Sequence, residues 1–215
     1  RRIDRSRRAF LCGTGTLLGG LAAASATGTA AGTDTVPTSV LGRTGITVSR
    51  LGIGCAHFQR KHVTPDDVRA TLERALQLGV TYLDTAPVYG NPQTGFAEEK
   101  MGPALRERFF LVTKTEEPTA EGTWRLLRQS LKRMRTEYID LVHLHNFGDE
   151  AQWGDLDLAL GPKRALGALQ EARKRGVIRF IGASGHLHPS RFHRALDTGA
   201  IDVLNGAKVC ATLEE

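Results

Sequence analysis

The chain has 215 residues, of which 40% are apolar and 24% charged, which suits one sizeable globular domain or two small ones. The net charge is +6, but residues 1–8 hold five Arg and one Asp, so the rest carries only +2 and a basic nucleic-acid-binding surface is excluded. The three cysteines (Cys12, Cys55 and Cys210) show no metal-ligand spacing and no even-numbered disulfide framework, and no apolar run is long enough for an ordinary membrane span.

The first predicted element is an export signal at residues 1–31. The segment SRRAFLC is followed by the Gly- and Ala-rich GTGTLLGGLAAASATGTAA, which includes small residues of A-x-A type at Ala24-Ser25-Ala26. Arg7-Arg8 ahead of Phe10-Leu11 resembles the twin-arginine signal, which exports folded proteins. We therefore expect recognition by the twin-arginine export machinery and an exported, periplasmic or extracytoplasmic protein without a stable membrane anchor. A disordered Arg-rich tail is the alternative.

The body of the chain, residues 36–215, alternates strand and helix patterns. TSVLGRTGITVS predicts a β-hairpin, and LGIG at 51–54 predicts a buried strand. Thr64 and Pro65 suit the N-cap and first position of an amphipathic helix that ends at Gly79. Further strands are expected at 81–86, 109–114, 138–145, 178–184 and 201–205, and helices near 96–107, 119–136, 163–175 and 190–198.

This alternation predicts right-handed βαβ units and a parallel sheet. Six such strands fit an open doubly wound sheet or part of an eight-stranded barrel. No G-x-G-x-x-G follows the first strand, which disfavours the open dinucleotide-binding sheet. Polar residues instead occupy the C-terminal ends of successive strands, where barrel enzymes build their sites: Cys55, His57, Asp84, Lys114, His145, Ser184 and His186. The sequence therefore predicts an α/β fold of the (β/α)8 TIM-barrel type, with about six βα units and an N-terminal β-hairpin.

Four residues of this edge form a candidate acid site. Asp84, Lys114 and His145 end three consecutive strands, and Tyr89 lies on the loop above the first of these. A phenol is a poor acid at neutral pH, but an adjacent ammonium stabilises the phenolate, and a carboxylate keeps that ammonium charged and in place. A neutral imidazole can orient a carbonyl oxygen. Together these groups could protonate an alkoxide as it forms.

Residues 38–205 resemble the aldo-keto reductase family. LGRTGITVSRLGIGC is similar to its opening hairpin and first strand, YLDTAPVYGN to its Asp-and-Tyr motif, LVTK to its lysine strand, YIDLVHLHN to its histidine strand, and GVIRFIGASG to the strand that holds the nicotinamide carboxamide. The resemblance implies a catalytic tetrad of Asp84, Tyr89, Lys114 and His145. It also implies NADPH, with NADH as an alternative, and a small-molecule carbonyl substrate that could be an aldehyde, a ketone or a sugar. It indicates no particular oligomeric state.

The resemblance further implies that the backbone at Gly54 and Cys55, together with Ser184, Gly185 and Asn205, binds the cofactor. Gly185 stands where the family usually has Asn, and Asn205 where a Gln is common. Two further barrel strands would follow in the family, so we expect a barrel that is incomplete at its C-terminal end. Such a chain is expected to leave two strands with unpaired edges, to fold poorly or pair with itself, and to bind NADPH weakly.

Two other functions fit parts of the pattern. A metal-dependent barrel hydrolase could use the H-x-H pair His143 and His145 with His57, His186, His188 or Asp84, although such hydrolases more often carry H-x-H on the first strand. Alternatively, the chain could be a cofactor-binding remnant or regulatory module with impaired catalysis.

Overall fold

The computed structural model describes residues 35–102, 106–147, 149–186 and 189–206. The predicted signal at 1–31, Cys210 and His188 lie outside these residues, so the expectations that concern them stay predictions. In the described ranges, no helix is both long enough and apolar enough to cross a membrane.

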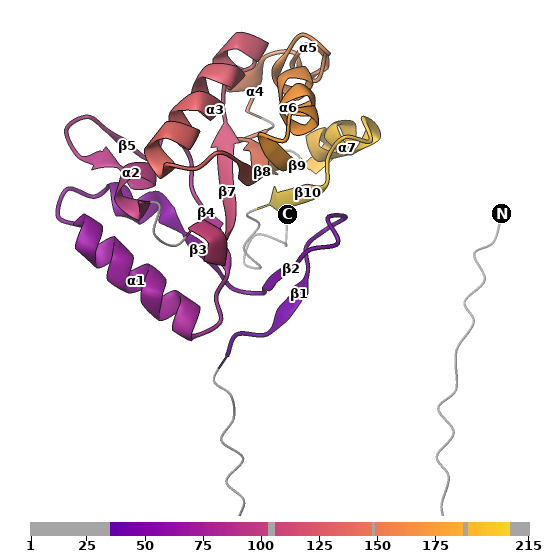
Figure 1. Ribbon diagram of the computed structural model, residues 1–215. Coiled ribbons are helices and arrows are strands. Elements are labelled where there is room, and N and C mark those ends of the chain that lie inside the picture. The colour runs from indigo at the N-terminus through magenta and orange to yellow at the C-terminus, as the bar shows by residue number, and fades with distance from the viewer. Residues whose placement is uncertain (1–34, 103–105, 148, 187–188, 207–215) are drawn as a thin grey trace, which may run out of the picture. The chain divides into compact units, whose positions relative to one another are not determined.

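Strands and helices alternate along the described chain (Figure 1). The strands are β1 (Thr38–Val40), β2 (Thr47–Ser49), β3 (Gly52–Gly54), β4 (Tyr82–Asp84), β5 (Gly90–Asn91), β6 (Gly95–Phe96), β7 (Phe110–Thr115), β8 (Ile139–Leu144), β9 (Ile178–Gly185) and β10 (Val203–Gly206). The helices are α1 (Pro65–Gln77), α2 (Ala97–Met101), α3 (Ala120–Met134), α4 (Glu150–Trp153), α5 (Leu156–Ala159), α6 (Ala165–Lys174) and α7 (Pro189–Asp197), with the 3-10 turns η1 (Cys55–Gln59) and η2 (Arg106–Arg108).

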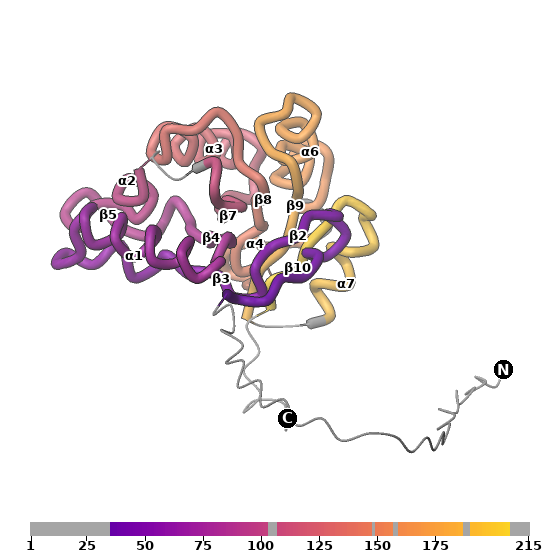
Figure 2. The backbone as a smooth tube through the Cα atoms, turned by 60° about the horizontal axis from the view of Figure 1, so that its bottom comes forward, coloured from indigo at the N-terminus to yellow at the C-terminus, as the bar shows by residue number. Residues whose placement is uncertain are grey.

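The main sheet has six strands in the order β10-β9-β8-β7-β4-β3, and every neighbouring pair is parallel. This confirms the predicted α/β class and the six βα-type strands. The strands follow a curve with the helices on its outer side, as in part of a barrel (Figure 2). Within the described chain, β3 and β10 are the two edges of this sheet.

The prediction that LGIG forms a buried strand is wrong. Leu51 is 56% exposed, and Gly52 and Gly54 are also exposed. The physical reason is position, because among the described residues β3 pairs only with β4 in the six-stranded sheet and forms one of its edges. A short apolar run cannot by itself distinguish a central strand from an edge strand.

Side chains alternate across the sheet and form two apolar layers. The outer layer packs strand residues such as Leu83, Leu111 and Ile181 against the helices. The inner layer contains Val48, Phe110, Val112, Leu141 and Val203. Because the inner face continues beyond this layer toward the strand ends, it also carries Asp84, Lys114 and Ser184, which line a cavity there, while the fully buried His143 lies in register with Lys114.

The predicted hairpin forms and lies against the start of the last strand. Thr38–Val40 pairs antiparallel with Thr47–Ser49. The Arg43 amide donates to the Asp202 carbonyl at 3.1 Å, and the Arg43 guanidinium donates to the Ile201 carbonyl. Figure 2 shows the hairpin beside β10. Val48 packs in the inner layer, so the hairpin covers the end of the sheet opposite the polar residues.

Local signals set the start of α1 and the early end of α2. Thr64 and Asp67 form a reciprocal capping box at α1, with Pro65 at the first position. The helix expected near 96–107 is shorter than predicted, since α2 ends at Met101. Gly102 takes a φ of 60° and is followed in sequence by a proline, which interrupts the helical pattern.

Candidate active site

Lys114 lies at the centre of the polar cluster, at the C-terminal end of β7. Its side chain is only 4% exposed and forms an ion pair with Asp84 at the end of β4. Nζ also donates to the Thr85 carbonyl at 2.8 Å and to the Tyr89 hydroxyl at 3.4 Å. A buried ammonium requires such partners, because desolvation without them is costly. The carboxylate and the phenol therefore meet at one cation.

Tyr89 is held over this cation by a tight loop. Its carbonyl accepts a hydrogen bond from the Ala97 amide at 2.8 Å, which joins the loop to the start of α2. Gly90 has a φ of 123°, and a Cβ there would lie 2.1 Å from the Gly95 carbonyl oxygen. Only glycine fits this position, because the backbone of β6 passes directly beside it. The half-buried Tyr89 ring packs against the outer core.

His145 enters the site from the end of β8. Its amide donates to the Thr115 carbonyl at 2.8 Å, and its carbonyl accepts from the Trp153 indole at 2.7 Å. The imidazole lies edge-on to the Tyr89 ring, with 6.1 Å between the ring centres. Burial is the largest cause that lowers the pKa of His145 to about 4, followed by the positive charge of Lys114. The imidazole is therefore neutral at physiological pH.

All four residues of the candidate acid site line one cavity of about 140 Å³, which we name the hollow. Its remaining lining residues are Asn146, Ser184, Gly185, His186 and Asn205. Asn146 received no role from the sequence, although a polar residue directly after a strand end is a usable signal. Its left-handed φ of 48° is tolerated better by Asn than by most residues.

Glu116 is a second neighbour that the sequence interpretation missed. One carboxylate oxygen lies 3.7 Å from Nδ1 of His145, and burial raises the pKa of Glu116. Its position in the sequence, two residues after Lys114 at the same strand end, could have indicated that it lies near the site.

The residues expected to bind a cofactor do not all line the same cavity. Ser184, Gly185 and Asn205 line the hollow. Gly54 lines a neighbouring cleft of about 460 Å³ between the hairpin, β3 and β10, which shares Asp84 and Asn205 with the hollow. Cys55 is fully buried in the core, where burial raises the pKa of its thiol, and its side chain lines neither space.

The geometry does not support the metal-dependent alternative. Among the described residues, no three His, Cys, Asp or Glu side chains lie close enough to hold a metal ion. His57 and His186 are exposed, whereas His143 is fully buried beside Lys114 in the strand register. Neither ring nitrogen of His143 has a hydrogen-bond partner in the described chain. The His143 ring packs directly against the backbone of Gly182, where an added Cβ would lie 2.3 Å from Nδ1.

His143→Leu is expected to reduce the acid sensitivity of the fold. Burial lowers the pKa of His143 to about 3, so its unfolded form binds more protons as the pH falls through the ordinary histidine range. The free energy of unfolding is therefore highest above that pH range and decreases as the pH falls through it. Between about pH 6 and pH 4, the wild type should lose up to about 1.4 kcal/mol more per pH unit than the variant.

Urea unfolding at several pH values checks this expectation, with His57→Gln as a control that removes an exposed imidazole. At neutral pH the leucine variant should be at least as stable as the wild type, because it leaves no buried polar atom unpaired. Identical pH slopes for wild type and His143→Leu would contradict the neutral, unpaired state of His143.

Comparison with known proteins places the chain among the barrel-type α/β oxidoreductases. A profile described as the aldo/keto reductase family matches residues 50–205, which is more than half of the chain. The chain therefore belongs to the aldo/keto reductase family.

Individual relatives agree with this assignment. The chain is 30% identical over 181 residues to the L-galactose dehydrogenase of Arabidopsis thaliana, covering 76% of this chain and 54% of the relative. It is 28% identical over 207 residues to a D-threo-aldose 1-dehydrogenase of a Pseudomonas species, covering 80% and 60%. Among solved structures, the holo form of aldo-keto reductase AKR11C1 from Bacillus halodurans superposes with a TM-score of 0.65 at 26% identity, covering 80% of this chain and 58% of that one. The chain spans about half the length of the curated relatives it matches.

Proposed function

We propose that this protein reduces an aldehyde or ketone to an alcohol with NADPH, and that Tyr89 supplies the proton. The observation that carries the proposal is the position of Lys114 Nζ, which contacts both the Asp84 carboxylate and, at 3.4 Å, the Tyr89 hydroxyl. Family membership and the dehydrogenase and reductase names of its relatives support the reaction class.

The residues beside the tetrad fit the nicotinamide end of the cofactor. Ser184 is buried, and within the part of the chain that the structure describes its hydroxyl makes only a long 3.5 Å contact to the Leu144 carbonyl, so it has hydrogen-bonding capacity left for a carboxamide. Asn146 and Asn205 add amide donors and acceptors to the same hollow. At Gly54 an added Cβ would meet nothing within 4 Å, so the backbone there is open to the adjoining cleft. When bound, a reduced nicotinamide supplies the hydride that adds to the carbonyl carbon.

The protein's own groups would manage the charge that develops on the carbonyl oxygen. The neutral His145 imidazole would donate a hydrogen bond to that oxygen and orient it. Tyr89 would then transfer its phenolic proton to the forming alkoxide, and the adjacent Lys114 ammonium would stabilise the phenolate that remains. Asp84 would keep Lys114 charged and aimed at the phenol.

The test is NADPH oxidation by the full chain, with NADPH in excess and a panel of aldehydes, ketones and aldose sugars. The sugars are included because two relatives are named as L-galactose and D-threo-aldose dehydrogenases. Carbonyl-dependent oxidation with stoichiometric alcohol formation is the expected result. NADPH binding without turnover of any carbonyl would instead favour the cofactor-binding module.

We also propose that residues 1–31 direct export through the twin-arginine machinery. The support is the Arg7-Arg8 pair ahead of a Gly- and Ala-rich stretch that carries no charge. Substituting both arginines by lysine is expected to retain the protein in the cytoplasm of a bacterial host, whereas the unaltered chain should reach the periplasm. Equal distribution of the two proteins would contradict export by this route.

A further inference from the structure

Glu98, the second residue of α2, is a carboxylate with no exposed surface. Its Oε1 accepts hydrogen bonds from Thr113 at 2.8 Å and from Ser130 at 2.7 Å. Thr113 precedes Lys114 on β7, and Ser130 lies on α3, so this carboxylate joins strand β7 of the main sheet to helices α2 and α3. Burial raises the pKa of Glu98, while the hydrogen bonds and Arg133 oppose that shift. Within the described chain, Oε2 has no hydrogen-bond partner.

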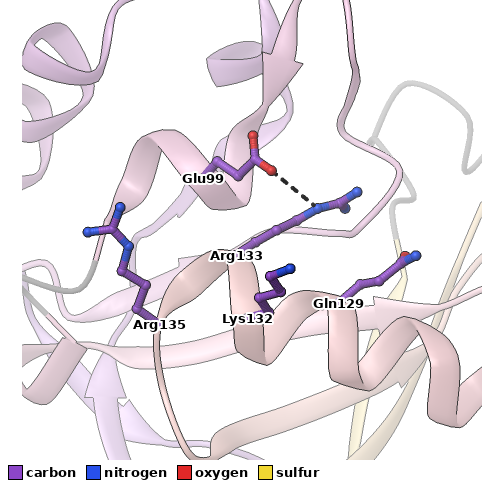
Figure 3. Close-up of a pocket in the computed structure, with 5 residues that line it drawn as sticks. All are labelled: Glu99, Gln129, Lys132, Arg133 and Arg135. Carbon is purple, nitrogen blue, oxygen red and sulfur yellow. Dashed lines mark ion pairs between the residues drawn. The ribbon is translucent and has the colours of Figure 1, made fainter.

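Arg133 is the charged group that faces this free oxygen. Its NH1 lies 3.6 Å from Glu98 Oε2 and donates a 2.9 Å hydrogen bond to the Pro87 carbonyl. The guanidinium also lies 3.4 Å from the centre of the Phe96 ring. Figure 3 shows the side chain directed to Glu99, with Nε 3.7 Å from that carboxylate, while Lys132 and Arg135 line the same surface pocket. Arg133 itself is only 15% exposed.

The two loop contacts of Arg133 bracket the catalytic phenol. Pro87 lies two residues before Tyr89, and Phe96 pairs with Gly90 in the β5–β6 ribbon. The loop between them contains Gly90 and Gly95, and these two residues contribute no side-chain packing that would hold the loop against the rest of the protein. Pro87 is buried, and its carbonyl would lose a charged donor if Arg133 were removed. The Tyr89 loop is therefore fixed from the outer face of the sheet.

We propose that Arg133, anchored by Glu98, is a positioning residue that sets the height and direction of the Tyr89 hydroxyl over Lys114. The inference rests on the proposed function for its catalytic consequence, but the restraint itself is a property of the loop. Lysine cannot replace this arginine, because only the planar guanidinium can stack on Phe96 while donating to Pro87 and facing Glu98. A small displacement of a catalytic group can cost about a hundredfold in rate.

The experiment compares Arg133→Met with Lys132→Met and Arg135→Met, which remove the same charge from the same helix end and pocket (Figure 3). Arg133→Met is expected to lower kcat by about 10- to 100-fold while the KM for the carbonyl stays within about threefold. Amide hydrogen exchange in the 85–97 segment should rise by about tenfold or more, with 110–115 unchanged. The two control variants should match the wild type in both measurements.

Arg133→Lys keeps the charge opposite Glu98 and covers the case in which the methionine variant does not fold. It should show the same loss of kcat and the same faster exchange. If the wild type oxidises no NADPH, the proposed function fails, and hydrogen exchange still decides the loop restraint. Wild-type exchange in 85–97 for either Arg133 variant, or an equal loss of kcat in Arg135→Met, would overturn the inference.

Discussion

Tyr89→Phe is expected to lower kcat for carbonyl reduction by about 10²- to 10⁴-fold, the range that a positioned general acid contributes. The phenyl ring can keep its packing against the core and its edge-on contact with His145, since neither uses the hydroxyl. Only the proton and the 3.4 Å contact with Lys114 are removed. The loss should therefore appear in kcat, with NADPH affinity nearly unchanged.

Stopped-flow or steady-state NADPH oxidation measures kcat, and nicotinamide fluorescence measures binding. Tyr138→Phe is the matched control, because it removes a phenolic hydroxyl from an exposed residue just before β8. Unchanged turnover in Tyr89→Phe would sink the assignment of the proton donor, even if the reductase activity itself were present.

Lys114→Met is expected to abolish turnover and to lower the free energy of unfolding by about 3–5 kcal/mol. The cation is 4% exposed and neutralises Asp84, which is itself only 17% exposed. Removing it leaves a poorly solvated carboxylate and also deprives the Thr85 carbonyl of its donor. Breaking one side of a buried pair costs more than removing both charges, because the remaining charge has no partner.

The double variant Lys114→Met/Asp84→Asn tests that reason directly. It should be more stable than Lys114→Met alone, although both lack activity. Lys174→Met, on the exposed surface of α6, controls for the loss of a lysine. If urea unfolding shows Lys114→Met to be as stable as the wild type, the ion pair does not stabilise the fold.

Much of the fold was predictable because its signals are local. The capping box at Thr64 and Asp67 fixed the start of α1, and alternating strand and helix patterns predicted the six parallel strands. The inward direction of Asp84, Lys114 and His145 follows from strand alternation, and the structure brings them together with Tyr89 around one hollow.

Other features depended on contacts between distant segments. β3 is exposed because it lies at an edge of the sheet in the described chain, a fact that its own three residues do not encode. Cys55 follows the first strand as expected, yet it is buried in the core rather than lining the hollow. The contacts of Arg133 could not be predicted from the sequence of its helix, because its partners Pro87, Phe96 and Glu98 lie more than thirty residues away in the chain.

The sequence by itself determined the order of the six sheet strands and pointed to the four residues of the candidate acid site, because periodicity and strand ends are properties of short segments. Only the tertiary structure decided which charges are desolvated. Burial lowers the pKa values of His145 and His143, so both imidazoles are neutral. The fold also brings Lys114 into an ion pair with Asp84 and places the buried Glu98 beside Arg133. Desolvation of a side chain depends on all the elements packed around it. The charge and position of Lys114, Asp84 and His145 beside Tyr89 are therefore set by the tertiary structure.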